Sequence, residues 1–211
     1  MKINEIILEG PLPDDWDAKV YDKRNTFKNR VAYAKQRARQ LGTGSSRIAF
    51  EIPYQGRPTV LKIAKNAKGM AQNQEEADLF SDWYLQNTGF VIPLVDHHED
   101  DDPTWIHTEF AEKMTPKKFQ SFFGVDQYTL NSYVQAIRKH DHRRADAILA
   151  SYNIDLDENE LFSDYATLFG SEYTHVNIAD LNGIRNWGIY DGRPVIIDLG
   201  FSDSVAKLYG F

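Results

Sequence analysis

The first clear pattern in the chain is helical. From about Asn25 or Thr26, apolar residues recur every three or four positions, which predicts one helix that ends at Gly42. Its apolar stripe consists of Phe27, Val31, Ala34, Ala38 and Leu41. Residues 25–39 also carry five Lys or Arg side chains, so we expect this helix to be basic.

Beyond this helix the apolar period changes to two. Residues 47–52 and 59–63 predict two strands joined by a turn over residues 55–58. The other expected elements, in chain order, are a single helix over 69–86, strands over 91–97 and 104–110, a mainly helical block over 116–169, and a hairpin of strands 186–190 and 194–198 around Asp191-Gly192. This order favours an α+β protein with two lobes joined near residues 111–116.

Composition narrows the class of protein. The 211 residues include 42% hydrophobic and 13% aromatic residues, which favours a packed chain. No cysteine is present, which excludes disulfides and thiolate metal sites and favours the cytoplasm. No apolar run has bilayer length, so we expect no membrane partner. The net charge of −7 argues against indiscriminate binding to nucleic acid.

A loop of small residues precedes the first predicted strand. In such a loop, backbone N–H groups can approach the phosphates of a nucleotide between two strands. The candidate residues are Gly42, Thr43, Gly44, Ser45 and Ser46. Small residues also occur in turns for purely conformational reasons, so this loop alone does not decide the function.

A lysine follows on the second predicted strand. Lys62 alternates with apolar residues and lies one hairpin after the loop, where its ammonium can reach nucleotide phosphates if a carboxylate holds it. Glu75 and Glu76 on the next helix are the candidates for that carboxylate. We favour Glu76, because it shares a helix face with Asn73, whereas Glu75 points about 100° away. The alternative is that all three charges lie on the surface.

The strongest signal is near the end of the chain. Asp198 closes an apolar strand, where a carboxylate is costly unless it meets a cation, and Asn186 begins the partner strand. Both side chains can therefore face one metal ion. Asp180 would orient the attacking hydroxyl or accept its proton. The alternative is a turn in which Asp180 and Asn186 cap local backbone.

In chain order these parts resemble the ATP-site elements of the protein-kinase-like superfamily, which includes protein kinases, aminoglycoside and choline phosphotransferases, and short kinase-like proteins of bacteriophages. The matching positions are the loop 42–46, Lys62, Glu76, the hinge-like segment 108–111, Asp180 with Asn186, and residues 198–200. The run 68–76 is similar to the phage-type branch. The resemblance implies a two-lobed α+β fold with a small antiparallel-sheet N-lobe over 41–111, a truncated, mainly helical C-lobe over 112–211, and an N-terminal extension over 1–40.

The resemblance also implies a role for each residue. Lys62 would contact the α and β phosphates of ATP, Glu76 would anchor Lys62, and Asp180 would be the catalytic aspartate. The other implied contacts are those of the Glu109 and Ala111 backbone with adenine, and of Asn186 and Asp198 with Mg²⁺.

The chain departs from the family pattern in several places. The interval from Asp180 to Asn186 is one residue longer than usual, so we expect either that the loop bulges or that the metal geometry differs from that of the family. Ile178 stands where the family usually has histidine, and Asn182 replaces a common lysine or histidine, with Arg185 as a substitute charge. The sequence ends at Phe211, so we expect no activation segment, and the phosphate acceptor is not indicated.

Three functions follow as hypotheses. The first is an ATP- and Mg²⁺-dependent phosphotransferase of kinase-like fold, with a bacteriophage among the expected sources. The second is a pseudokinase, which is a nucleotide-binding or structural module without turnover. The third is a protein that docks a partner through the basic helix 25–39, with the kinase-like body regulating that contact.

Overall fold

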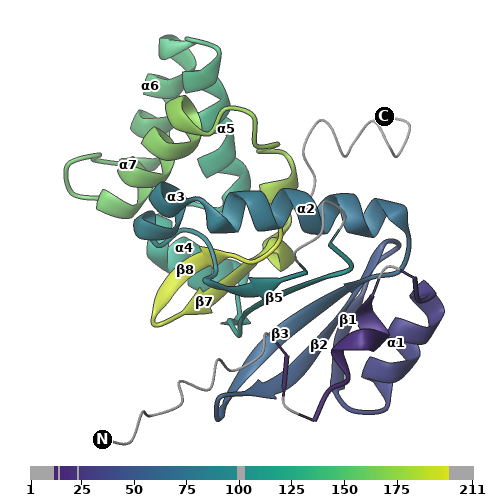
Figure 1. The fold of residues 1–211 in the computed structure, drawn as a ribbon. Coiled ribbons are helices and arrows are strands. Elements are labelled where there is room, and N and C mark those ends of the chain that lie inside the picture. Colours follow the sequence, from purple (N-terminus) through teal and green to yellow (C-terminus); the bar gives the residue numbers. More distant parts are fainter. Residues whose placement is uncertain (1–11, 14, 23, 99–102, 200–211) are drawn as a thin grey trace, which may run out of the picture. The chain divides into compact units, whose positions relative to one another are not determined.

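The computed structural model describes residues 12–13, 15–22, 24–98 and 103–199 (Figure 1). The protein is α+β and divides into two compact units. The first unit comprises the described residues up to Ala77 together with Pro93–Phe110, and the second comprises Asp78–Ile92 and the described residues from Ala111 onward. This division differs from the expected one, because residues 78–92 belong to the second unit and the segment before residue 41 belongs to the first.

The first unit is built on a five-stranded antiparallel sheet with the strand order β1-β2-β3-β5-β4. The strands are β1 (Arg39–Thr43), β2 (Arg47–Tyr54), β3 (Arg57–Ala64), β4 (Leu94–His97) and β5 (Trp105–Glu109). The β2–β3 turn consists of Gln55 and Gly56, which both have positive φ. The strands predicted from alternation are therefore confirmed, and the turn is shorter than expected because β3 already begins at Arg57.

The N-terminal segment covers one face of this sheet. Residues of the 3-10 helix η1 (Ala18–Tyr21) and of the helix α1 (Phe27–Lys35) share a single core with the strands. The buried members of that core are Leu12, Trp16, Tyr21, Ala34, Ile48, Phe50, Ile52, Leu61, Ile63 and Trp105. Side chains alternate across a strand, so Lys62 lies on the other face from Leu61 and Ile63.

The prediction of one helix from residue 25 to Gly42 is wrong. Helix α1 ends at Lys35, and residues 39–43 form β1, in which Arg39 lies opposite Glu51. The side chain of Leu41, assigned to the apolar stripe, is 40% exposed. Residues 39–43 pair with β2 in the sheet instead of continuing the helix, so tertiary context overrides the apolar period here. The basic helix is correspondingly shorter than 25–39.

The prediction of a single helix over 69–86 is also wrong. The structure has α2 (Ala67–Ser81) followed by α3 (Trp83–Thr88), and Asp82 separates them. Asp82 has extended backbone angles, and its carboxylate accepts a hydrogen bond from Leu85 N at 2.9 Å. A residue that caps the next helix cannot continue the previous one, so the break follows from local capping.

The second unit combines helices with a small three-stranded sheet of order β6-β7-β8. After α3 its helices are α4 (Pro116–Phe123), α5 (Gln127–Arg138), α6 (His142–Tyr152) and α7 (Glu160–Thr167), followed by one π-helical turn, η2 (Leu168–Glu172). Its strands are β6 (Glu112–Lys113), β7 (Trp187–Tyr190) and β8 (Arg193–Ile196). The helical block and the hairpin around Asp191-Gly192 are confirmed, whereas β6 was not predicted.

Aromatic side chains form the core of the second unit. Trp187 of β7 packs against Phe119, Phe123 and Tyr165, with ring centroids 5.0 to 5.8 Å apart. All four side chains are buried. The hairpin is therefore fixed to α4 and α7 at the point where β7 begins, directly after the loop that holds Asp180 and Asn186.

Candidate functional site

A buried charge cluster occupies the face of the first sheet that α1 does not cover. Lys62 Nζ lies 2.6 Å from Glu76 Oε2, and Arg47 Nη2 lies 2.9 Å from Glu76 Oε1. Glu76 is fully buried, and Lys62 and Arg47 are 9% and 8% exposed. One carboxylate therefore meets two cations in a place with little water, which makes each contact stronger than on the surface.

The choice between Glu75 and Glu76 is settled by these contacts. Glu76 holds both cations, whereas Glu75 is half-buried and its side chain makes no ion pair or hydrogen bond with the described residues. Asn73, one turn before Glu76, accepts from Arg47 at 3.4 Å and donates to Pro103 O at 3.0 Å. Sequence reasoning missed Arg47. Ala49 pairs with Lys62, so the two side chains share one face of the sheet. Arg47 is two residues before Ala49 on the same strand, and strand alternation therefore places its side chain on that face as well.

The small-residue loop joins β1 and β2, and hydrogen bonds from the residues that follow β3 hold it in place. Gly44 N donates to Arg47 O at 2.9 Å, which closes the turn between β1 and β2. The chain after β3 then holds the loop carbonyls, because Lys65 N donates to Ser46 O at 2.7 Å and Asn66 Nδ2 donates to Ser45 O at 3.3 Å.

Other contacts fix this loop further. The Ser46 hydroxyl donates to Gln72 Oε1, and the Lys65 ammonium donates to Gly44 O and to Thr43 Oγ1. In contrast, the backbone N–H groups of Ser45 and Ser46 meet no acceptor among the described residues. The loop thus has its carbonyls engaged and two N–H groups available, which is the polarity that binds anions.

The hinge-like segment lies where the chain passes from the first unit to the second, after Phe110. The Glu109 side chain is 10% exposed and accepts from Arg57 Nη2 at 2.5 Å. Its backbone N–H donates to Pro93 O at 3.0 Å, and its carbonyl accepts from the Thr108 hydroxyl at 3.2 Å. Both backbone groups of Glu109 therefore already have partners within the first unit, and only Ala111 belongs to the second.

The loop from Asp180 to Asn186 forms two short 3-10 turns, η3 (Asp180–Asn182) and η4 (Ile184–Asn186), separated by Gly183. Gly183 N donates to Asp180 O at 3.1 Å, and Asn186 N donates to Gly183 O at 2.9 Å. The additional residue between Asp180 and Asn186, relative to the spacing in the resembling family, is thus accommodated by regular 3-10 turns.

Asn186 closes the same loop through its side chain. Its Nδ2 donates to Asp180 O at 2.8 Å, and the residue is 4% exposed. No donor among the described residues reaches Oδ1 of Asn186. Oxygen atoms of this kind are ligands that Mg²⁺ accepts, so the amide is oriented with its nitrogen used and its oxygen available.

The surrounding helices hold this loop in place. Asn131 of α5 donates from Nδ2 to Asn182 Oδ1 at 2.9 Å and accepts from the Tyr165 hydroxyl at 2.8 Å. Burial holds the pKa of Tyr165 far above its ordinary range, so its hydroxyl stays a donor. Trp187 Nε1 donates to Leu181 O at 2.9 Å. Sequence reasoning did not identify Asn131, because its partner lies 51 residues away.

Asp198 lies close to Asn186 along the backbone pairing of the hairpin. Trp187 pairs with Ile196, and Ile197 N donates to Asn186 O at 2.8 Å, so Asp198 is one residue beyond the pair. The hairpin therefore brings Asp198 and Asn186 to the same end, as expected from the sequence. Asp198 is half-buried, and Gly200 of the resembling motif lies outside the described residues.

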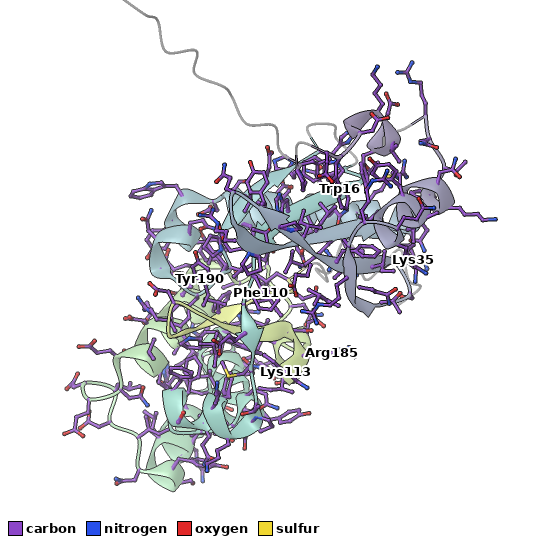
Figure 2. The ribbon with its side chains drawn as sticks, turned by 90° about the horizontal axis from the view of Figure 1, so that it is seen from below. Trp16, Lys35, Phe110, Lys113, Arg185 and Tyr190 are labelled. Carbon is purple, nitrogen blue, oxygen red and sulfur yellow. The ribbon has the colours of Figure 1, made fainter. Side chains whose placement is uncertain are left out.

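Two other positions singled out in the sequence differ in environment. Ile178 is 2% exposed and packs inside the second unit, whereas Arg185 is exposed (Figure 2).

Within the described residues, no three His, Cys, Asp or Glu side chains gather as a metal-binding group. No helix of the described chain is long and apolar enough to cross a bilayer.

No family model matches this sequence, and no curated protein matches it.

Proposed function

We propose that this protein is an ATP- and Mg²⁺-dependent phosphotransferase with a protein-kinase-like two-lobed fold. The observation that carries the proposal is the buried ion pair between Lys62 on β3 and Glu76 on α2, next to a hairpin loop with available N–H groups. Protein kinases require a strand lysine paired with a helix glutamate under a glycine-rich loop. The chemistry is catalysed by position and charge, without a covalent enzyme intermediate.

In this proposal the first unit holds the phosphates. Lys62 donates to the α and β phosphates, and Glu76 keeps its ammonium at the required place. Glu76 is shared with Arg47, so the carboxylate that positions Lys62 is itself held from two sides. The Ser45 and Ser46 N–H groups add donors from the loop. The Glu109 carbonyl, which can accept a second hydrogen bond, and the Ala111 backbone would contact adenine.

The second unit supplies the metal ligands and the catalytic carboxylate. Asn186 Oδ1 and an Asp198 oxygen would hold Mg²⁺, which neutralises charge that develops on the phosphates during transfer. Asp180 orients the acceptor hydroxyl and takes its proton. The bond between Asn186 Nδ2 and Asp180 O fixes the spacing of these two residues before any ligand binds.

A nucleotide-binding module without turnover is the second candidate. The observation that favours it is Ile178, an apolar and buried side chain at the position where the resembling family usually has histidine. A protein partner bound through α1, a cytoplasmic location and a bacteriophage origin stay predictions. Asp180 and the available oxygen of Asn186 favour the enzyme.

The experiment compares unfolding and turnover. At an ATP concentration about 100 times Kd in the presence of Mg²⁺, binding should raise the free energy of unfolding by about 2.7 kcal/mol. Labelled ATP and a panel of protein and small-molecule acceptors then test transfer, with Asp180→Asn as the variant that should bind ATP but lose turnover. A shift with no ADP or labelled product identifies the module without turnover. The absence of any shift contradicts both candidates.

A further inference from the structure

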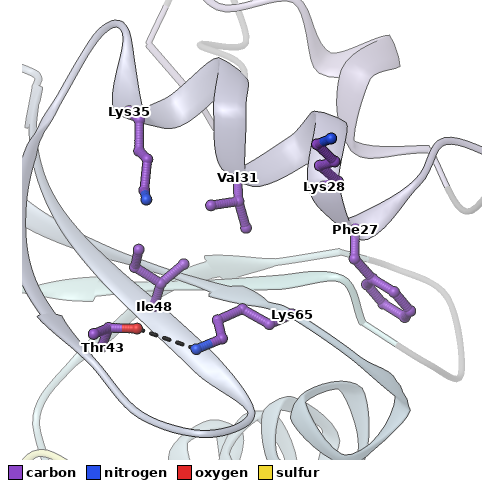
Figure 3. A pocket seen from close by; sticks show the side chains of 7 residues that line it. All are labelled: Phe27, Lys28, Val31, Lys35, Thr43, Ile48 and Lys65. Atoms are coloured by element: carbon purple, nitrogen blue, oxygen red, sulfur yellow. Dashed lines mark hydrogen bonds between the residues drawn. The ribbon is translucent and has the colours of Figure 1, made fainter.

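A pocket of about 310 Å³ lies between α1 and the β1–β2 hairpin of the first unit (Figure 3). Its apolar lining comes from Phe27 and Val31 on α1 and Ile48 on β2. Phe27 and Val31 are one helical turn apart, so they present one continuous apolar strip to the pocket. The volume is at the lower end of the range for small-molecule sites, about 300 to 1,000 Å³.

The rest of the lining is cationic and polar. Lys28, Lys35 and Lys65 line the pocket together with Thr43, and no lining residue is acidic. Figure 3 shows Lys35 extending from α1 toward Ile48, while Lys65 reaches Thr43 from the other side. Three ammonium groups beside one small pocket repel one another. An anion between them would offset this repulsion.

No acidic side chain among the described residues pairs with the three lysines. The side chains of Lys28 and Lys35 make no ion pair or hydrogen bond with the described residues. Lys65 is half-buried, and its ammonium is held by Thr43 Oγ1 at 3.2 Å and by the Gly44 carbonyl, which are both uncharged. Lys65 is therefore an oriented cation at the pocket, and one of its three donors stays available.

This pocket is separate from the Lys62 cluster. Ile48 pairs with Ile63 across β2 and β3, whereas Lys62 pairs with Ala49. Side chains of successive strand residues point to opposite faces, so Ile48 and Lys62 lie on opposite faces of the sheet. A ligand in the pocket would thus lie on the α1 side and would not contact Glu76.

We infer that this pocket binds a small organic phosphate, with its apolar group on Phe27, Val31 and Ile48 and its phosphate among the lysines. Three cations favour a ligand with more than one negative charge, and a phosphate monoester carries about −1.5 to −2 at pH 7. Lysine binds phosphate as a point charge, so the site selects for charge and size. The inference does not depend on the proposed phosphotransferase activity.

The test is a titration of the ¹⁵N-labelled full chain with phenyl phosphate, followed by NMR. We expect shift changes in α1 and at Ile48, and weaker binding of benzoate, inorganic phosphate and benzyl alcohol, which each lack part of the required chemistry. Lys28→Met and Lys35→Met should each weaken binding roughly threefold to fivefold, the upper range for an exposed ion pair. Both variants replace exposed side chains, so the fold should persist, which the spectrum itself reports.

Lys117→Met is the matched control, because Lys117 is an exposed lysine on α4 in the other unit. Its binding of phenyl phosphate should equal that of the unmodified chain. Shift changes restricted to residues outside the pocket would overturn the inference. So would equal binding by the Lys28→Met, Lys35→Met double variant, or benzyl alcohol binding as tightly as phenyl phosphate. ATP and Mg²⁺ are absent from this titration, so its outcome is independent of the proposed activity.

Discussion

Lys62 on β3 and Glu76 on α2 form an ion pair with 2.6 Å between Nζ and Oε2, although 14 residues separate them in the chain. The pair is enclosed by the sheet and the helix, and Arg47 contacts the second carboxylate oxygen. Glu76 therefore fixes the orientation of α2 on the sheet as well as the position of the Lys62 ammonium. The contribution of Glu76 to the stability of the fold and the proposed role of the Lys62–Glu76 pair in phosphate binding can be tested separately.

The first prediction concerns stability. Glu76→Gln keeps the shape of the side chain but removes the buried negative charge that Lys62 and Arg47 share, so the free energy of unfolding should fall by about 3 kcal/mol. Glu75→Gln changes the adjacent, half-buried residue and should stay within about 0.5 kcal/mol of the unmodified chain. Urea unfolding of both variants measures the difference. Equal losses in the two variants would mean that Glu76 does not hold the cluster.

The second prediction concerns the attachment of the small-residue loop to α2. A Cβ added at Gly69 would lie 2.2 Å from the Ser46 carbonyl oxygen, whereas at Gly42 it would meet nothing within 4 Å. Gly69→Ala should therefore cost about 2 to 3 kcal/mol, as expected for overpacking against backbone. Gly42→Ala should be nearly neutral for stability. Thermal unfolding compares them, and a neutral Gly69→Ala would show that the loop is not packed on α2.

The third prediction concerns acid sensitivity in the second unit. The Tyr173 hydroxyl donates to Asp82 Oδ1 at 2.6 Å, and this hydrogen bond lowers the pKa of Asp82 from its ordinary 3.8. A lowered pKa means that the stabilisation is full above the unfolded pKa and is lost as the pH falls through the folded pKa.

Tyr173→Phe removes the donor and keeps the ring. Because Asp82 is partly exposed, the variant should lose only about 1 kcal/mol at pH 7. The difference from the unmodified chain should shrink below about pH 4, where Asp82 becomes protonated in the unfolded chain. Urea unfolding at several pH values measures this, and a difference that stays constant down to pH 2.5 would contradict it.

Local patterns predicted most strands and several neighbour relations among the candidate site residues. Alternation placed Lys62 on a strand, and helical geometry selected Glu76 over Glu75. The Asp191-Gly192 turn fixed the register that brings Asp198 beside Asn186. These features depend on residues close in sequence or on a simple period, and such features can be read from one chain.

Other features depend on distant partners. Arg39 is part of β1 because Glu51 and the rest of β2 pair with it, and the apolar period gave no sign of this. The contacts of Lys65 with the Gly44 carbonyl and of Asn131 with Asn182 join residues 21 and 51 positions apart. The pocket near α1 likewise depends on where α1 ends, which the helical pattern placed seven residues too late, at Gly42 instead of Lys35.

The fourth prediction tests the central proposal, that this protein binds ATP with Mg²⁺ and that Lys62 and Asp198 contribute to that binding. Isothermal titration calorimetry should detect ATP binding in the presence of Mg²⁺. Lys62→Met and Asp198→Asn should each weaken that binding at least about tenfold, a loss of about 1.4 kcal/mol. Lys117→Met and Asp191→Asn, which change exposed residues, should bind normally. The proposal is contradicted if the unmodified chain binds no ATP, or if Lys62→Met and Asp198→Asn bind it as tightly as the unmodified chain does.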